Sequence, residues 1–247
     1  MALRLGLALA IAAMALSGWL APRVAGANEI SLPTPGSDGW RPLVFRGVAN
    51  QTQYTLESFE GIEVARAESN CGASGLVLRL DEIDLAQTPL LSWRWRIDRG
   101  LDLSQEQSKT EDDFAARVYI LFELDESRAS TLKRLRHRLA KFIYGKDIPG
   151  STLNFVWTSR LPEGTVWENP FEASAKMIAL AQGANAGWRR ETVDVVARYH
   201  EVFRTPIAPL LGLAIMSDSD NSCQHTEARF ADFKFLGTRN VGGQDAE

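Results

Sequence analysis

Short segments that alternate apolar and polar residues follow one another along most of this chain. In residues 112–123, reading every second position separates a core face from a polar face. The core face holds Phe114, Ala116, Val118, Ile120 and Phe122. The opposite face holds Asp113, Ala115, Arg117, Tyr119, Leu121 and Glu123. A strand needs no such set of acids, arginine and phenol in order to fold, so this segment is the first candidate for a functional site.

The same alternation predicts further strands on both sides of this segment. They cover residues 54–59, 61–67, 76–80, 91–98, 153–158, 176–181, 187–194, 211–216 and 229–236. Residues 40–45 are expected at a sheet edge, because Pro42 cannot donate to a central ladder. Trp93 and Trp95 fall on one face, which indicates a thick core between two layers. Arg94 and Arg96 then share the other face.

Helices are few in this pattern. Residues 132–143 show apolar spacing typical of a helix, and residues 195–203 are expected to form a shorter one. Many short strands with few helices are typical of an antiparallel β-sandwich or jelly roll. We expect one such domain over residues 40–238, after a linker at 28–39 and before a disordered tail at 239–247.

The beginning of the chain resembles an export signal. Arg4 precedes the uncharged segment 5–21, and Ala25-Gly26-Ala27 is a small-residue cleavage pattern. Residues 1–27 are therefore predicted to be a signal peptide, which places the protein in the periplasm or outside the cell. The alternative is an uncleaved membrane anchor.

Composition narrows the classes of partner. The sequence has 27 basic and 31 acidic residues, and loss of Arg4 and Arg23 with the leader leaves a net charge of about −6. This balance argues against general nucleic-acid binding. Cys71 and Cys223 are the two cysteines of the chain. In an oxidising compartment they are candidates for a disulfide, the alternative being two unpaired thiols.

Several segments together resemble a bacterial exported family, domain-of-unknown-function family 3047. The likeness is carried by Asp112-Asp113-Phe114-Ala115-Ala116-Arg117-Val118-Tyr119, Leu153-Asn154-Phe155-Val156-Trp157, Asn169-Pro170, Ala214-Ile215-Met216-Ser217-Asp218-Ser219-Asp220-Asn221 and Phe230-Ala231-Asp232-Phe233. Weaker likeness extends to Trp93-Arg94-Trp95. The resemblance implies a jelly-roll-like sandwich similar to some carbohydrate-binding modules, and a shared fold does not determine function.

Acidic residues that follow two apolar strands form the next candidate group. Asp112, Asp113, Asp218, Asp220 and Asn221 would gather if those strand ends meet. Oxygen ligands at alternate positions suit Ca²⁺, but this segment is shorter than an EF-hand loop and lacks its glycine and distal glutamate. The other interpretation is a turn in which these side chains bond their own backbone. We therefore expect no cofactor, with calcium as the weaker alternative.

Glycan sites combine flat aromatic rings with side chains that hydrogen-bond hydroxyl groups in pairs. The complete candidate set for ligand binding is Asp112, Asp113, Arg117, Tyr119, Asn154, Trp157, Asn169, Asp218, Asp220 and Asn221, with Trp167 as a further aromatic. Asn154 and Trp157 face opposite ways in a strand, so one of them is expected to be structural. Arg117 either binds an acidic sugar or forms a buried ion pair.

Three functional hypotheses follow. The first is a non-catalytic ligand-binding module of the cell envelope, with a glycan as candidate ligand. The second is an enzyme acting on envelope polysaccharide, a glycosidase or lyase, that uses Asp113 with Asp218 or Asp220. The third is a structural or interaction protein. The segment 130–143 has five basic residues and no acid between Ser130 and Lys141, so it either contacts anionic lipid or is a solvated helix face.

Overall fold

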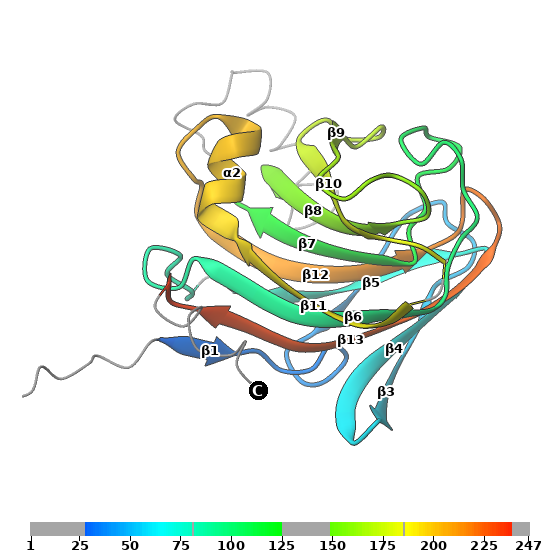
Figure 1. Ribbon diagram of the computed structural model, residues 1–247, viewed down its shortest axis with the longest axis horizontal. Helices are drawn as coiled ribbons and strands as arrows, with labels where there is room; N and C mark the ends of the chain where they lie inside the picture. The colour runs from blue at the N-terminus through cyan, green and yellow to red at the C-terminus, as the bar shows by residue number, and fades with distance from the viewer. Residues whose placement is uncertain (1–27, 81, 125–148, 185, 239–247) are drawn as a thin grey trace, which may run out of the picture.

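The computed structural model describes residues 28–80, 82–124, 149–184 and 186–238. In this part of the chain, thirteen strands and one helix form two stacked sheets (Figure 1). The predicted helix at 132–143, its proposed lipid contact, the leader and the tail lie outside the described residues. None of the described helices is long and apolar enough to span a membrane.

Sheet A has six strands. Its central path runs β11 (Ala186–Asp194), β6 (Leu90–Arg99), β13 (His225–Leu236), β4 (Ile62–Asn70) and β3 (Gln53–Phe59), and β1 (Glu29–Ser31) also pairs with β13. Every pairing in it is antiparallel. Within residues 28–39, expected to be a linker or an extended entry segment, residues 29–31 are extended and pair with β13.

Sheet B has seven strands. Its order is β2 (Arg41–Val44), β5 (Ala73–Arg79), β12 (Leu210–Asp218), β7 (Ala116–Phe122), β8 (Ser151–Thr158), β10 (Ala175–Gln182) and β9 (Val166–Glu168). β2 lies at the edge, as Pro42 predicts. β8 and β10 are parallel, a departure from a purely antiparallel sandwich. This pair exists because β9, unexpected from the sequence, turns back along the outer side of β10.

The core lies between the sheets and contains apolar residues of β5, β6, β7, β8, β12 and β13. Trp93 and Trp95 are fully buried, and their rings meet edge to face with centroids 5.4 Å apart. Phe155 of the opposite sheet packs on Trp93 at 5.7 Å. The two-layer sandwich predicted from alternation is therefore confirmed.

Helix α2 (Val195–Phe203) follows β11 directly and covers one end of the sandwich (Figure 1). It begins where the Asp194 carboxylate accepts a hydrogen bond from the Ala197 backbone N–H, which satisfies an amide that the helix itself leaves free. It ends at Arg204 in the left-handed conformation. Val195 and Tyr199 are the buried residues of the helix, so its apolar side faces the core.

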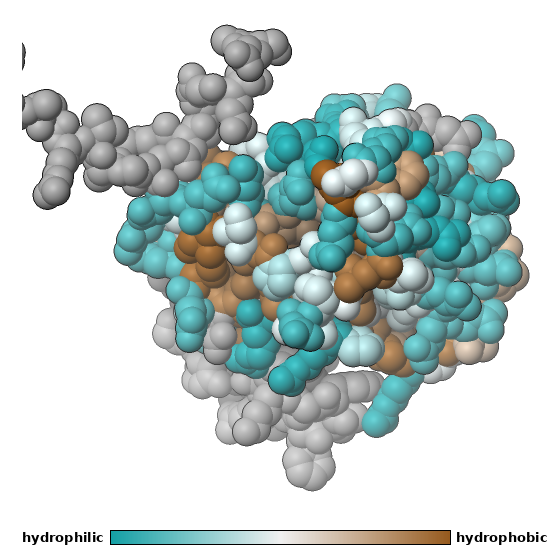
Figure 2. All heavy atoms as spheres, turned by 90° about the horizontal axis from the view of Figure 1, so that it is seen from below, coloured by the Kyte–Doolittle hydropathy of each residue, from teal (hydrophilic) through white to brown (hydrophobic). Residues whose placement is uncertain are grey.

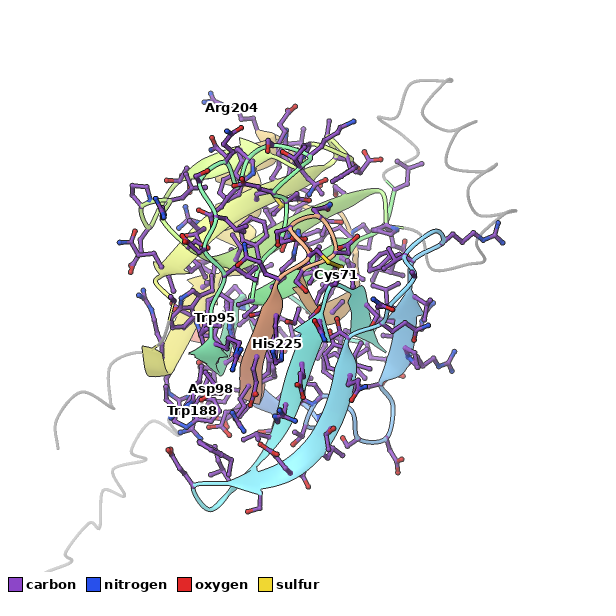
Figure 3. All side chains as sticks on the ribbon, turned by 90° about the vertical axis from the view of Figure 1, so that its right-hand side faces the viewer. Cys71, Trp95, Asp98, Trp188, Arg204 and His225 are labelled. Carbon is purple, nitrogen blue, oxygen red and sulfur yellow. A yellow bond between two sulfur atoms is a disulfide. The ribbon has the colours of Figure 1, made fainter. Side chains whose placement is uncertain are left out.

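The described surface is mostly hydrophilic when seen from below, with apolar patches between polar side chains (Figure 2). Large apolar residues that are exposed are spread over different elements, namely Ile30, Val44, Leu56, Val166 and Phe171. On the outer face of sheet A, arginines pair with carboxylates, for example Arg66 with Glu227 at 2.7 Å and Arg96 with Asp98 at 2.6 Å. In the view from the right of Figure 1, Asp98 and Trp188 lie close together at one end of this sheet (Figure 3).

Candidate functional site

Seven residues on the outer face of sheet B form one register row that crosses every strand. From β2 to β9 the row consists of Arg41, Val77, Ala214, Tyr119, Asn154, Met177 and Trp167. Chain neighbours of the row on β5, β7 and β8, such as Leu76, Val118 and Phe155, point into the core instead. Neighbouring strands lie roughly 4.8 Å apart, so the row is about 29 Å long.

The β8–β10 half of this row is covered. Asn154 and Met177 have no exposed surface, because the rings of Phe114 and Trp167 pack above them with centroids 6.1 Å apart. The sequence placed Phe114 on the core face, and this prediction is wrong. β7 begins only at Ala116, so Phe114 belongs to the preceding loop and folds onto the outer face.

Arg117 stands beside the row and forms a buried ion pair. Its Nε donates to Asp218 Oδ1 at 2.7 Å, and its Nη2 donates to Asp218 Oδ2. The side chains of Arg117 and Asp218 are 3 % and 2 % exposed. The Asp112 carboxylate lies 3.6 Å from Arg117 Nη1, and the guanidinium lies over the Phe114 ring at 4.5 Å. Of the two interpretations of Arg117, the geometry matches the buried ion pair.

Asp113 has a different role from the one its position in the sequence suggests. It lies in the loop before β7 and not on the strand face that carries Arg117. Its two carboxylate oxygens accept from the backbone N–H groups of Asn221 and Ser222, at 3.1 and 2.6 Å. Asp113 is fully buried and therefore holds the 217–222 loop against the start of β7.

The acids that the sequence expected to gather do converge. One carboxylate oxygen from each of Asp113, Asp218 and Asp220 lies within 4.8 Å of the others. The oxygens of Asp113 and Asp218 are, however, already engaged by backbone amides and by Arg117. The guanidinium thus supplies positive charge that a calcium ion would otherwise bring.

Burial dominates the electrostatics of this cluster. It raises the pKa of Asp218 to about 8, although the Arg117 guanidinium opposes the shift. Burial also raises the pKa of Asp112, and burial together with the Asp113 carboxylate raises that of Asp220. Burial lowers the pKa of Arg117, but the Asp218 carboxylate outweighs it, and the pKa lies above its ordinary value.

Two polar atoms near the covered half of the row have no hydrogen-bond partner within the structure. These are Asn154 Oδ1 and Trp167 Nε1, both shielded from solvent. The Asn154 amide nitrogen donates to the Met177 sulfur at 3.0 Å. Asn169, also in the candidate set, donates to Asp112 Oδ2 at 2.9 Å. Buried polar atoms without partners are uncommon in folded proteins and point to a missing water or ligand group.

The β2–β7 half of the row is open. A pocket of about 200 Å³ lies there, lined by Gly39, Arg41, Val77, Leu78, Arg79, Leu121 and Leu211. Leu211 reaches this face because the register shifts between Leu210 and Gly212, where β12 carries a bulge against β7. The sequence did not single out these residues. Alternation in 76–80 placed Val77 and Arg79 opposite the core, but it does not reveal which strands are neighbours.

Trp157 was among the predicted ligand-binding residues, and this prediction is wrong. The side chain lies in the core, with its ring 5.6 Å from that of Trp95 and its Nε1 donating to the Gly183 carbonyl at 3.0 Å. Asn154, on the other face of β8, belongs to the outer row. One residue of the pair Asn154 and Trp157 was expected to be structural, and that residue is Trp157.

A disulfide joins Cys71 and Cys223, which are 152 residues apart (Figure 3). It connects the turn after β4 to the loop after β12, next to the segment that Asp113 holds. Of the two alternatives for the cysteines, a disulfide and two unpaired thiols, the structure has the disulfide.

The sequence profile of a family described as protein of unknown function (DUF3047) matches residues 38–234. The chain belongs to the DUF3047 family. The match spans both sheets from β2 onwards, so the row and the acidic cluster lie within the part that defines the family. No curated protein matches the chain.

Several solved structures have a similar arrangement of strands. A family 11 carbohydrate-binding module from Clostridium thermocellum, in complex with a mixed-linked tetrasaccharide, has 9 % identity and a TM-score of 0.43, covering 85 % of this chain and 95 % of that one. A family 30 module of a cellulosomal cellulase from the same organism has 11 % identity and a TM-score of 0.42, covering 86 % and 99 %. Endoglucanase 3 from Trichoderma harzianum, family GH12, has 10 % identity and a TM-score of 0.39, covering 86 % and 98 %. At these values the comparison carries no argument about ligand or activity for this DUF3047 protein.

Proposed function

We propose that this DUF3047 protein is a non-catalytic ligand-binding module, and that its site is the outer face of sheet B with a glycan as ligand. The observation that carries the proposal is the register row of seven residues. It combines a guanidinium, a phenol, an amide and an indole along one line of about 29 Å, of which the half from β2 to β7 is open to a ligand.

The chemistry of the row suits a polyhydroxylated ligand. Tyr119 stands half-buried at its centre, between the open pocket and the covered amide of Asn154. Sugar hydroxyls donate and accept, so one lying on the open half of the row could bond the Tyr119 hydroxyl. Apolar side chains such as Val77 and Leu121 would pack against the C–H faces of a ring.

The enzymatic alternative uses Asp113 with Asp218 or Asp220, and two of these three acids are engaged by other groups of the protein. Asp113 is completely buried, and its oxygens are bound by backbone amides. Asp218 is bound on both oxygens by Arg117. A general acid must reach the glycosidic oxygen, and neither carboxylate has an exposed edge from which to do so. These contacts favour binding over turnover for Asp113 with Asp218, while Asp220, the other partner that the sequence nominated, is half-buried.

We further propose that the protein works outside the cytoplasm, in the periplasm or beyond it. The predicted leader at residues 1–27 supports this location. The Cys71–Cys223 disulfide supports it independently, because such bonds persist in oxidising compartments and are rare in the cytosol.

A glycan array probed with the purified protein tests the proposal. We expect saturable binding to at least one glycan and no new reducing ends during incubation. Tyr119→Ala should weaken that binding about tenfold or more, whereas Trp188→Ala should leave it unchanged. Trp188 is a suitable control because it is also a half-buried aromatic residue but lies on sheet A, against Arg94 and Phe59. Absence of binding to every glycan would refute the proposal, and release of reducing ends would replace it with the enzyme.

A further inference from the structure

The open end of the register row is positively charged. Arg41 and Arg79 both line the 200 Å³ pocket, and no acidic residue lines it. Arg41 is the register partner of Val77, and Arg79 lies two residues beyond Val77 on the same face of β5. The two guanidinium groups therefore belong to one wall of the pocket, above a floor formed by Val77, Leu121 and Leu211.

We propose that this pocket recognises an anionic group, a carboxylate or a phosphate, carried by a glycan that lies along the row. The inference rests on the proposed function and extends it from glycans in general to acidic glycans. Guanidinium groups bind such anions through paired hydrogen bonds, and an apolar floor strengthens the attraction by excluding water.

Arg41 differs from the arginines of the other sheet in a way that supports this role. Arg66, Arg96 and Arg229 on sheet A each contact at least one carboxylate within 3.3 Å. Arg41 makes no ion pair with any residue in the described ranges, and its side chain is exposed at the pocket. Its charge is thus available to a ligand without first breaking an internal contact.

The proposal places the acidic-sugar site at Arg41 and not at Arg117, the residue that the sequence suggested. Arg117 is enclosed by Asp218 and Asp112, so its donors are directed at carboxylates of the protein itself. Arg41 lies on the same face but at the far side of the sheet, beyond Ala214 and Val77 in the row. The pocket is smaller than those that enclose whole drug-sized ligands, which suits one charged ring at the end of a chain.

Matched oligosaccharides separate this inference from the function on which it rests. Glucans, mannans and galactans are offered in three forms: neutral, oxidised at C6 to the carboxylate, and phosphorylated at C6. We expect at least one acidic form to bind about tenfold more tightly than its neutral counterpart, with affinity that falls as salt is added. Arg41→Gln should remove that tenfold preference, so that the acidic form binds no more tightly than the neutral form. Arg99→Gln, an exposed arginine of sheet A with no ion pair among the described residues, should change nothing.

The outcomes are distinct. Equal binding of neutral and acidic forms, or an undiminished preference in Arg41→Gln, overturns the charged pocket and leaves glycan binding intact. Failure of every oligosaccharide to bind overturns the proposed function and this inference with it. Inorganic phosphate that competes as tightly as the 6-phosphorylated sugar would show that the pocket selects a free anion rather than a glycan, and would overturn the inference as stated. The preferred acidic form identifies carboxylate or phosphate as the group recognised.

Discussion

Arg117 on β7 and Asp218 at the end of β12 form a two-point ion pair, although 101 residues separate them in the sequence. The contact is possible because β7 and β12 are neighbours in sheet B and Arg117 is registered against Met216, two residues before Asp218. Asp218 also accepts from the Phe114 backbone N–H at 3.2 Å, so the pair connects both strands to the loop before β7.

Removing one partner of this pair should be costly. At pH 9, above the pKa of about 8 for Asp218, Arg117→Ala leaves an ionised Asp218 buried without its counter-charge, and we expect a loss of about 3 to 5 kcal/mol in the free energy of unfolding. Urea unfolding measures the loss. The double variant Arg117→Met with Asp218→Leu should lose less than Arg117→Ala alone, because no buried charge remains. Wild-type stability in Arg117→Ala would show that the ion pair has no structural role.

The buried acids predict how stability changes with pH. The pKa of Asp218 is about 8 in the folded protein and near 4 for an ordinary aspartate, so between these values the folded state holds a proton that the unfolded state releases. The free energy of unfolding should therefore fall as the pH rises from about 4 to about 8. Urea midpoints at pH 5 and pH 9 should show this fall.

Two variants test whether Asp218 causes the pH dependence of stability. Asp218→Asn keeps the shape of the side chain and cannot titrate, so its urea midpoint should depend less on pH than that of the wild type. Asp102→Asn, which changes a carboxyl that is 83 % exposed, should retain the full pH dependence. A midpoint that rises with pH in the wild type would contradict the assignment.

The disulfide should contribute strongly to stability. It closes a loop of 152 residues, and its loss should lower the free energy of unfolding by about 2 to 5 kcal/mol. The double variant Cys71→Ser with Cys223→Ser tests this by thermal or urea unfolding. Because the chain has two cysteines in all, dithiothreitol should destabilise the wild type and have no effect on the variant. Equal stability of reduced and oxidised protein would disprove the contribution.

Two tryptophans that entered the same candidate set should behave differently. Trp157 is 4 % exposed and packs on Trp95 in the core, so Trp157→Ala should cost about 3 to 5 kcal/mol of stability. Trp167 is half-buried on the outer face against Phe114, so Trp167→Ala should cost clearly less and should weaken glycan binding. Thermal melts and glycan titrations of both variants decide between core and site. Similar losses of stability would contradict this division.

Much of the secondary structure follows from local pattern. Alternation of side chains is a property of one extended segment, so the core faces of β6, β7 from Ala116 onwards, and β8 could be predicted without knowing their neighbours. Helix α2 was also predictable, with the bounds 195–203, because its apolar spacing is local. The sequence predicted that Asp113, Asp218 and Asp220 would converge only if the two strands next to them were neighbours.

The sequence by itself determined which face of each strand is apolar and which segments are extended, because these depend on residues within a few positions of one another. Tertiary structure decided the rest. Phe114 left the core face because the ladder of β7 starts two residues later, and Arg117 met Asp218 because β12 inserts between β5 and β7. Arg41 came into line with Tyr119 and Trp167 because seven strands share one register. Strand order and register arise from contacts between residues far apart in the chain. They determine which residues come together in the site.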